Sequence, residues 1–389
     1  MSILPAGGGR YYEAPELSLG AKLLRLNWLL VALIAATAGI GFLMLYSVAG
    51  GDLDPWARVQ IVRFALGFGA MILIALIDLR LWRLMAGLIY ALALGLLIAV
   101  ELFGSIGGGA QRWLEIGPLR LQPSEFMKVA LVLALAAYYH WLGPDRVNRP
   151  LWIAAPLILA LTPAALVASQ PDLGTALLLI LGAGVVMFLA GVSWWFFSAV
   201  LLGAAAGGYA VAVSRGTDWQ ILKDYQYRRI ETFLNPGADL RGAGYNIRQS
   251  EIAIGSGGLD GKGFLEGSQK SLLYLPEPHT DFIFASLAEE FGFRGGIGLL
   301  ALYMVTLMVA TASSFGIASS FGRLLVGGVL ATFFFFFAIN MAMVMGLAPV
   351  VGVPLPLVSF GGTSMMVILF GFGLALCAMV HRDDPMRRR

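Results

Sequence analysis

Residues 322–347 read "GRLLVGGVLATFFFFFAINMAMVMGL" and carry one charged side chain, Arg323, near their start. About 20 apolar residues suffice for an α-helix to cross the hydrocarbon core of a bilayer. The stretch is therefore predicted to be a membrane-spanning helix. Asn340, a polar residue within it, is expected to form an interhelical hydrogen bond.

Similar stretches recur along the chain. Of its 389 residues, 59% are hydrophobic and 13% are charged, whereas soluble domains carry about 25% charged residues. A transmembrane β-barrel would instead show short segments of alternating hydrophobicity. We predict an all-α, polytopic membrane protein of about ten helices, forming a single membrane domain over residues 1–389. The expected spans are 26–49, 59–77, 82–103, 124–142, 151–169, 173–190, 193–214, 281–311, 322–347 and 358–380.

Basic residues predict the orientation of these spans. With ten spans they fall on one side of the membrane, which the positive-inside rule makes cytoplasmic. They are Arg10, Lys22, Arg25, Arg80, Arg83, Arg146, Arg149, Arg323, Arg382, Arg387, Arg388 and Arg389. Both termini, residues 1–25 and 381–389, are therefore expected in the cytoplasm. The long interval 215–280 is expected to form an extracytoplasmic loop between the seventh and eighth helices.

This long interval is predicted to hold short helices joined by glycine turns. "DYQYRRIETFL" (224–234) and "YNIRQSEIAI" (245–254) place apolar and charged residues at near-helical spacing, as in helices that lie on a membrane face. "GSGGLDGKGF" (255–264) is rich in residues that favour turns and positive φ. Its glycine spacing matches neither a P-loop nor a Rossmann motif, so it is weak support for a phosphate site.

Ionisable residues at the ends of the spans are candidates for function, because a charge inside a membrane is costly. In "LQPSEFMKVALV" (121–132), Glu125 and Lys128 stand three positions apart, share a helix face and are expected to pair. Two interpretations follow. The pair is either structural, or it places a lysine at the mouth of the membrane to meet an anionic headgroup.

Asp281 lies in "LYLPEPHTDFIF" (273–284), where the chain returns to the membrane. It is either an N-terminal cap of the next helix or a carboxylate whose desolvation raises its pKa, as a general base requires. Thr280 offers an alternative cap for that helix. His279 and Asp281 alone do not define a metal site.

Three other polar features accompany Asp281. Of the adjacent Glu289 and Glu290, one is expected to face a cavity or a partner, because they point to different sides of the helix. Asp172 is expected to serve as a turn and N-cap residue. Residues 345–364 contain three prolines and four glycines between the last two spans, and are expected to form a cavity wall or hinge.

Five long motifs, in this order, resemble the SEDS family of cell-wall polymerases, which includes RodA and FtsW. They are "GAQRWLEIGPLRLQPSEFMK" (109–128), "QPDLGTA" (170–176), "GYNIRQSEIAIGSGGLDGKG" (244–263), "LPEPHTDFIFASLAEEFG" (275–292) and "GLAPVVGVPLPLVSFGGTS" (346–364). The resemblance covers nearly the whole chain, and the first and third motifs are more similar to RodA than to FtsW.

The resemblance implies a bacterial cytoplasmic-membrane enzyme, a peptidoglycan glycosyltransferase that polymerises lipid II for cell elongation and rod shape. It implies Asp281 as the catalytic base. Residues that it implies for substrate binding are Lys128, Glu125, Arg112, Arg229, Gln249, His279 and Ser359. It also implies a class B penicillin-binding protein as partner within the elongation machinery, and no nucleic acid. Because a diphosphate departs, a divalent cation (Mg²⁺ or Mn²⁺) is expected as cofactor, although no metal-binding spacing is present.

Three alternatives remain beside this function. An FtsW-like division polymerase would perform the same chemistry at another place in the cell. A lipid II flippase would use Glu125, Lys128 and the 345–364 hinge as gating parts. A non-catalytic scaffold would leave glycan synthesis nearly normal when Asp281 is replaced.

Overall fold

The computed structural model describes residues 17–107, 110–117, 119–217, 219–221, 227, 243–267 and 277–386. Helices occupy all ten predicted spans, which confirms the predicted polytopic helical fold. They are α2 (Trp28–Val48), α3 (Ala57–Leu76), α4 (Leu79–Phe103), α5 (Pro123–Leu142), α6 (Pro150–Ser169), α7 (Leu173–Leu189), α8 (Trp194–Ser214), α12 (Ile283–Ser314), α13 (Ser320–Val344) and α14 (Gly362–Val380).

Within the described residues, eight of these helices are long and apolar enough to cross a membrane. The other two are α7, an apolar helix of 17 residues, and α5, which carries the charged Glu125 and Lys128 in its first turns. Both pack inside the bundle against α13 and against each other. Neighbouring helices rather than lipid thus surround α5, and its charges do not have to face hydrocarbon.

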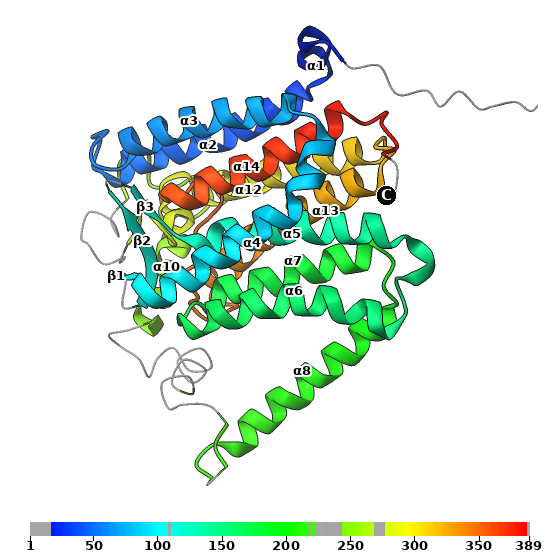
Figure 1. The fold of residues 1–389 in the computed structure, drawn as a ribbon. Coiled ribbons are helices and arrows are strands. Elements are labelled where there is room, and N and C mark those ends of the chain that lie inside the picture. The colour runs from blue at the N-terminus through cyan, green and yellow to red at the C-terminus, as the bar shows by residue number, and fades with distance from the viewer. Residues whose placement is uncertain are drawn as a thin grey trace, which may run out of the picture.

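The bundle is arranged around α5, α13 and α14, whose side chains are mostly buried (Figure 1). Helix α8 differs, since it runs away from the other helices in Figure 1 and buries only Ser214 among its described residues. Short helices complete the fold: α1 (Leu19–Arg25), the 3₁₀ turn η1 (Pro144–Arg146) and α10 (Ala243–Ser256).

Helix α10 corresponds to the second of the two amphipathic stretches. Ile247, Ser250 and Ala253 are buried, and the helix packs on α12 and α13. Its amphipathic pattern therefore reflects contact with protein, not only with a membrane face. The first stretch, residues 224–234, lies outside the described residues except for Tyr227.

A small antiparallel sheet, which the sequence analysis missed, precedes α5. It has the order β1 (Ser105–Gly107), β2 (Ala110–Ile116), β3 (Leu119–Leu121). Leu114 pairs with Leu121 across β2 and β3, and Arg120 lies 4.8 Å from the centroid of the Trp113 ring. The sheet packs against α4 and α5, and it leads the chain directly into the first turn of α5.

Basic residues gather at one end of the bundle. Arg25 pairs with Asp383 at 2.7 Å and Arg80 with Asp384 at 2.9 Å. The same C-terminal segment meets the connection between α12 and α13, where Ala318 N donates to Arg382 O at 2.7 Å. Asp281 lies at the opposite end of α12, one helix length away.

Candidate active site

Asp281 lies in a turn that precedes α12, and it is not the cap of that helix. The helix begins at Ile283 with Phe282 in the N-cap position, and no described side chain caps it. The Thr280 hydroxyl turns back instead to Glu277, donating to its carbonyl oxygen at 3.2 Å. Both capping interpretations were wrong, because the helix begins two residues later than expected. The Asp281 carboxylate therefore has no part in starting the helix.

The backbone around Asp281 is held by hydrogen bonds from residues far away in the sequence. Asn340 Nδ2 donates to Asp281 O at 2.9 Å and to Val353 O at 2.7 Å. Phe360 N donates to His279 O at 2.8 Å, and the Ser359 hydroxyl donates to Thr280 O. Three consecutive carbonyl groups are thus fixed by α13 and by the segment that leads to α14.

This arrangement corrects one expectation. Asn340 is buried, as predicted, but it bonds to two non-helical backbone segments and not to another helix. The irregular chain between α13 and α14 lies against Asp281, since a Cβ atom on Gly352 would stand 3.7 Å from Asp281 Oδ2. Gly352 has a φ of +69°, a conformation that favours glycine.

The surroundings of Asp281 raise the pKa of its carboxyl to about 6, first through burial and then through the negative charges of Glu277 and Asp172. Both effects disfavour the ionised form. The group is therefore ionised at neutral pH, yet it is a much better proton acceptor than an ordinary aspartate. A carboxylate in that state suits a general base.

His279 lies beside Asp281 with its ring stacked on that of Trp56, 4.5 Å between centroids. Burial lowers the pKa of the imidazole, so the ring is neutral at pH 7. Nδ1 is buried and has no hydrogen-bond partner among the described residues. A buried polar atom is normally paired, which keeps His279 a candidate for substrate binding.

The predicted pair of Glu125 and Lys128 forms in the first turns of α5. Lys128 Nζ stands 2.6 Å from Glu125 Oε1 and 3.8 Å from the centroid of the Phe336 ring. Asp172 interacts electrostatically with both Lys128 and Asp281. The lysine thus belongs to the same charged region as the candidate base.

Asp172 is the N-cap of α7, as predicted, and accepts a hydrogen bond from Thr175 N at 3.1 Å. Its other oxygen accepts from Gln122 Nε2 at 3.3 Å. Arg112 supports the same turn by donating to Gln170 O and Pro171 O. The Arg112 side chain therefore stabilises the turn before α7, in addition to the role in substrate binding that is predicted for it.

The remaining predicted substrate contacts have different settings. Ser359 accepts from Leu355 N at 2.9 Å in addition to its bond to Thr280 O. Gln249 is partly exposed on α10, at the end of the bundle where Ser250 Oγ donates to Val344 O at 2.8 Å. Arg229 lies outside the described residues. The substrate-binding roles of these three residues remain predictions.

Glycine-rich residues 257–263 form backbone hydrogen bonds with α12 at a point where that helix is interrupted. The helix is interrupted at Gly292, whose φ is 64° and ψ −163°. Phe293 N donates to Gly258 O at 2.9 Å, and Gly263 N donates to Glu290 O at 3.0 Å. The predicted turn-forming stretch thus satisfies peptide groups that the break releases, and it holds the part of α12 that follows Asp281.

Both glutamates beside this break are buried and have partners. Glu289 Oε1 stands 2.6 Å from Lys262 Nζ, and Ser47 Oγ donates to Glu290 Oε1 at 2.6 Å. The expectation that one of them faces a partner is confirmed for both. Through these contacts Lys262 and Ser47, which lie far from α12 in the sequence, are joined to the helix beside its break.

A protein-only metal site is not present in the described part of the chain, where no three His, Cys, Asp or Glu side chains stand close enough to hold an ion. Asp172 also has both oxygens engaged with Thr175 and Gln122. The described residues therefore do not by themselves fit the expected divalent cation. We derive no catalytic step through one, and the cation remains a prediction.

Asn340 and Gln60 position the site, a role that was not predicted for either residue. Asn340 was assigned to helix contacts, and Gln60, which donates to Ser359 O at 3.0 Å, was not considered. A polar residue within an apolar span was the available signal for both. The hydrogen-bond partners of Asn340 and Gln60 could not be predicted from the sequence, because they are backbone groups of segments about 60 and 300 positions away.

Replacing Asn340 with leucine is expected to lower kcat for the expected reaction, the polymerisation of lipid II, about tenfold, with little change in the KM for lipid II. It leaves the carbonyls of Asp281 and Val353 without their donor, at a cost of about 1–3 kcal/mol each. Thr332→Val is the matched control, because it removes a hydrogen bond within α13, to Gly328 O. Steady-state kinetics and thermal unfolding of both variants check the prediction, and equal kcat values in the two would contradict it.

Comparisons with known proteins agree with this geometry. The family model for FtsW, RodA and SpoVE, described as "Cell cycle protein", matches residues 27–384. The chain is 42% identical to the peptidoglycan glycosyltransferase MrdB of Escherichia coli K12 over 357 residues, 91% of this chain and 92% of that protein.

Two solved structures have the same fold. One, described as "Structural coordination of polymerization and crosslinking by a peptidoglycan synthase complex", is 33% identical with a TM-score of 0.77, over 92% of this chain and 98% of that one. The rod shape determining protein RodA of Thermus thermophilus is 30% identical with a TM-score of 0.69, over the same shares. The resemblance stated from the motifs is confirmed: the chain belongs to the FtsW/RodA/SpoVE (SEDS) family and is similar to its RodA-type members.

Proposed function

We propose that this chain is a peptidoglycan glycosyltransferase that polymerises lipid II for cell elongation. The observation that carries the proposal is Asp281, a carboxylate released from helix capping and held by three backbone hydrogen bonds around it. Its pKa of about 6 suits a base that works at neutral pH. The name of the Escherichia coli relative supports the same activity.

In this reaction Asp281 accepts the proton of the 4-hydroxyl group on the incoming sugar. The hydroxyl oxygen attacks the anomeric carbon of the growing strand, and the bond from that carbon to the lipid diphosphate breaks. The lipid diphosphate leaves with the electron pair of that bond. Lys128, Arg112 and Arg229 are the cationic residues that we assign to the diphosphate or its neighbourhood, since positive charge stabilises such a leaving group.

The reaction requires the Asp281 end of the bundle to face the outside of the cytoplasmic membrane. The clustering of Arg25, Arg80 and Arg382 at the opposite end supports that orientation, because basic residues favour the cytoplasm. Both termini are then cytoplasmic, and residues 215–280 are extracytoplasmic. The lipid tail of the substrate stays in the membrane while its sugars reach Asp281.

We further assign a class B penicillin-binding protein as partner. Support comes from the solved complex that couples polymerisation to crosslinking and shares this fold. Such a partner would crosslink the strands that this chain produces.

The test supplies labelled lipid II in detergent to the purified chain together with its transpeptidase partner, and separates the products on a gel. We expect a ladder of glycan strands that resists inhibition of the transpeptidase. Detergent removes any need for transport across a bilayer, so a flippase yields no ladder here. The proposal would be overturned if the chain moved labelled lipid II across the membrane of vesicles and formed no polymer.

The rate of polymerisation is expected to depend on pH through Asp281. Its carboxyl must be ionised to accept a proton, and its pKa is about 6. The rate should therefore fall as pH drops through 6, by about tenfold for each further unit. Initial rates between pH 4.5 and 8, as kcat/KM, check this: a plateau that continued below pH 5 would exclude a base with so high a pKa.

A further inference from the structure

Arg63 is a cation within a membrane-spanning helix, six positions after α3 begins at Ala57. Its guanidinium group points toward protein and not toward lipid. The guanidinium carbon Cζ lies 5.3 Å from the centroid of the Phe360 ring, and a Cβ atom on Gly362 would stand 2.9 Å from it. Arg63 is half-buried as a result. The proposed glycosyltransferase mechanism gives this residue no role.

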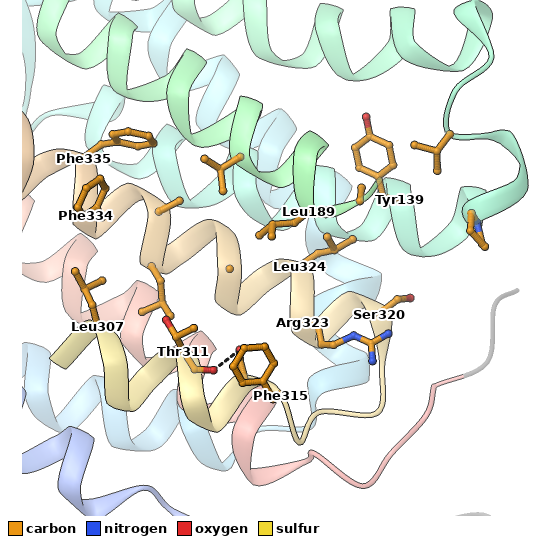
Figure 2. Close-up of a pocket in the computed structure, with 18 of the residues that line it drawn as sticks. Tyr139, Leu189, Leu307, Thr311, Phe315, Ser320, Arg323, Leu324, Phe334 and Phe335 are labelled. Carbon is orange, nitrogen blue, oxygen red and sulfur yellow. Dashed lines mark hydrogen bonds between the residues drawn. The ribbon is translucent and has the colours of Figure 1, made fainter. Parts of the chain in front are cut away.

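Arg63 differs from the other arginines of the membrane-spanning helices, each of which has an ion-pair or hydrogen-bond partner. Arg323, for example, lies beside the apolar cavity between α12 and α13 (Figure 2) and donates to Ile317 O at 3.4 Å. The others are Arg58, Arg80, Arg83 and Arg294. Arg63 has neither kind of partner among the described residues. Because a charge in a membrane helix is costly, an unpaired one indicates a function.

The surroundings of Arg63 do not neutralise its charge. No described carboxylate interacts electrostatically with it. Gly361 is the N-cap of α14 and offers no side chain to cap that helix, so the start of α14 presents its own partial positive charge to the guanidinium group. Gln60, three positions earlier on α3, has its amide bonded to Ser359 O and Gly361 N. An anion from outside the chain would therefore be stabilised at Arg63.

The depth of Arg63 suits the phosphate of a lipid. Trp56, which precedes α3, stacks on His279, so α3 begins at the Asp281 end of the bundle. Arg63 lies about 9 Å further along the helix, and the polar headgroup layer of a bilayer is about 5–8 Å thick on each side. In the proposed orientation, Arg63 is thus near the boundary of headgroups and hydrocarbon. Guanidinium groups bind phosphate oxygens there through charge-assisted, often bidentate hydrogen bonds.

Two diphosphates take part in the proposed reaction, and they lie at different distances from Asp281. The diphosphate of the growing strand is bonded to the anomeric carbon that is attacked, so it lies beside Asp281. The incoming lipid II carries its diphosphate at one end of its disaccharide, and the 4-hydroxyl group that Asp281 deprotonates is at the other end. A residue that holds this second diphosphate must therefore stand apart from Asp281.

Arg63 stands apart from Asp281, but two aromatic rings join it to the same turn. Phe360, which contacts Arg63, has its ring centroid 6.0 Å from that of His279, and its backbone N donates to His279 O at 2.8 Å. Arg63 and Asp281 do not interact electrostatically. This is the placement that the diphosphate of the incoming lipid II requires, and the leaving group beside Asp281 is out of reach.

A cation assigned to the leaving group comes from a different side of the bundle. Lys128 and Asp281 both interact electrostatically with Asp172, which places Lys128 in the charged region of the candidate base. Helix α5, which carries Lys128, and helix α3, which carries Arg63, lie on opposite sides of α14 in Figure 1. The two cations can therefore serve two different diphosphates.

We propose that Arg63 binds the diphosphate group of the incoming lipid II while the 4-hydroxyl group of that molecule reaches Asp281. This role rests on the proposed glycosyltransferase function. Arg63 holds the incoming molecule before and during the reaction and does not touch the bonds that form and break. Loss of Arg63 therefore weakens the binding of lipid II and leaves the chemical step unchanged.

Initial rates of polymerisation at varied lipid II concentration test this role in the chain purified with its transpeptidase partner. Arg63→Gln is expected to raise the KM for lipid II about tenfold, equivalent to about 1.4 kcal/mol. Its kcat should stay within about twofold of wild type. Arg58→Gln is the matched control, because it removes one positive charge from the same helix, where Arg58 is exposed and pairs with Asp54 at 3.5 Å. The control should leave KM unchanged.

The length of the glycan strands distinguishes the two diphosphates. At saturating lipid II, Arg63→Gln should make strands as long as those of wild type, because the hold on the growing strand is intact. Strands that are shorter at every lipid II concentration would show that Arg63 holds the growing strand instead, and would overturn the proposal. An equal KM for Arg63→Gln and wild type would also overturn it.

Direct binding separates this role from the proposed activity. Labelled lipid II is titrated in detergent into the Asp281→Asn protein, which should not consume it, with and without Arg63→Gln. We expect about tenfold weaker binding without Arg63. If wild type binds lipid II in this way but forms no polymer, the proposed function fails alone, whereas equal binding by the two proteins overturns the role of Arg63 alone. Should Arg63→Gln not fold, Arg63→Met, which suits an apolar helix, takes its place in both measurements.

Discussion

Polymerisation of lipid II is expected to fall at least about 100-fold in the Asp281→Asn variant, because the loss of a positioned general base typically costs 10²–10⁴-fold in rate. Asparagine is nearly isosteric with aspartate but accepts no proton. The hydrogen bonds that hold this turn go to backbone carbonyl groups, so the substitution leaves them in place. The measurement is the initial rate of glycan synthesis by the purified complex with its transpeptidase.

Glu277→Gln is the matched control for Asp281→Asn. It removes a carboxylate four positions earlier in the same turn, and Glu277 is exposed. Its negative charge helps to raise the pKa of Asp281, so this variant should retain activity and move the acid limb of the pH profile to lower pH. If a folded Asp281→Asn protein gave near-normal glycan synthesis, Asp281 would not be the catalytic base, and the chain would instead fit the non-catalytic scaffold.

The positions of the helices were predictable from sequence, because each span is a long apolar run whose length the bilayer sets. The exact residue at which each helix begins was harder to predict. The start of α12 was expected at Asp281, two residues too early, because Thr280 and Asp281 are typical N-cap residues and the apolar Phe282 that follows reads as part of the helix. The sheet β1–β3 was missed because its outer strands have three residues each, too few to show an alternating pattern.

The chemistry of the site was only partly predictable. Asp281 and the pair of Glu125 and Lys128 stand out in a sequence with 13% charged residues. The hydrogen bonds that surround these residues could not be predicted, because they involve backbone groups that only the fold brings together. Ser359 was assigned to substrate binding from the resemblance to the SEDS family, and that role remains a prediction. In the structure, the Ser359 hydroxyl bonds to two peptide groups near Asp281.

Loss of Lys128 is expected to have the largest effect on stability. Its side chain and that of Glu125 are 2% and 6% exposed, and removing one partner of a buried pair costs about 3–5 kcal/mol. Lys128→Met should therefore lower the thermal unfolding midpoint markedly, leaving the Glu125 carboxylate buried without its cation. Lys262→Met is the control: it breaks the pair with Glu289, but Lys262 is 29% exposed, so water replaces part of the interaction and the loss should be smaller.

The double variant Glu125→Gln/Lys128→Met separates the two interpretations of this pair. Removing both charges of a buried pair is often neutral or stabilising, so the unfolding midpoint should return near that of wild type. Glycan synthesis is expected to remain at least about tenfold lower, since the charge-assisted contact of Lys128 with the diphosphate would be lost. If activity returned together with stability, the pair would be purely structural, and the leaving group would have to be stabilised by other cations such as Arg112 or Arg229.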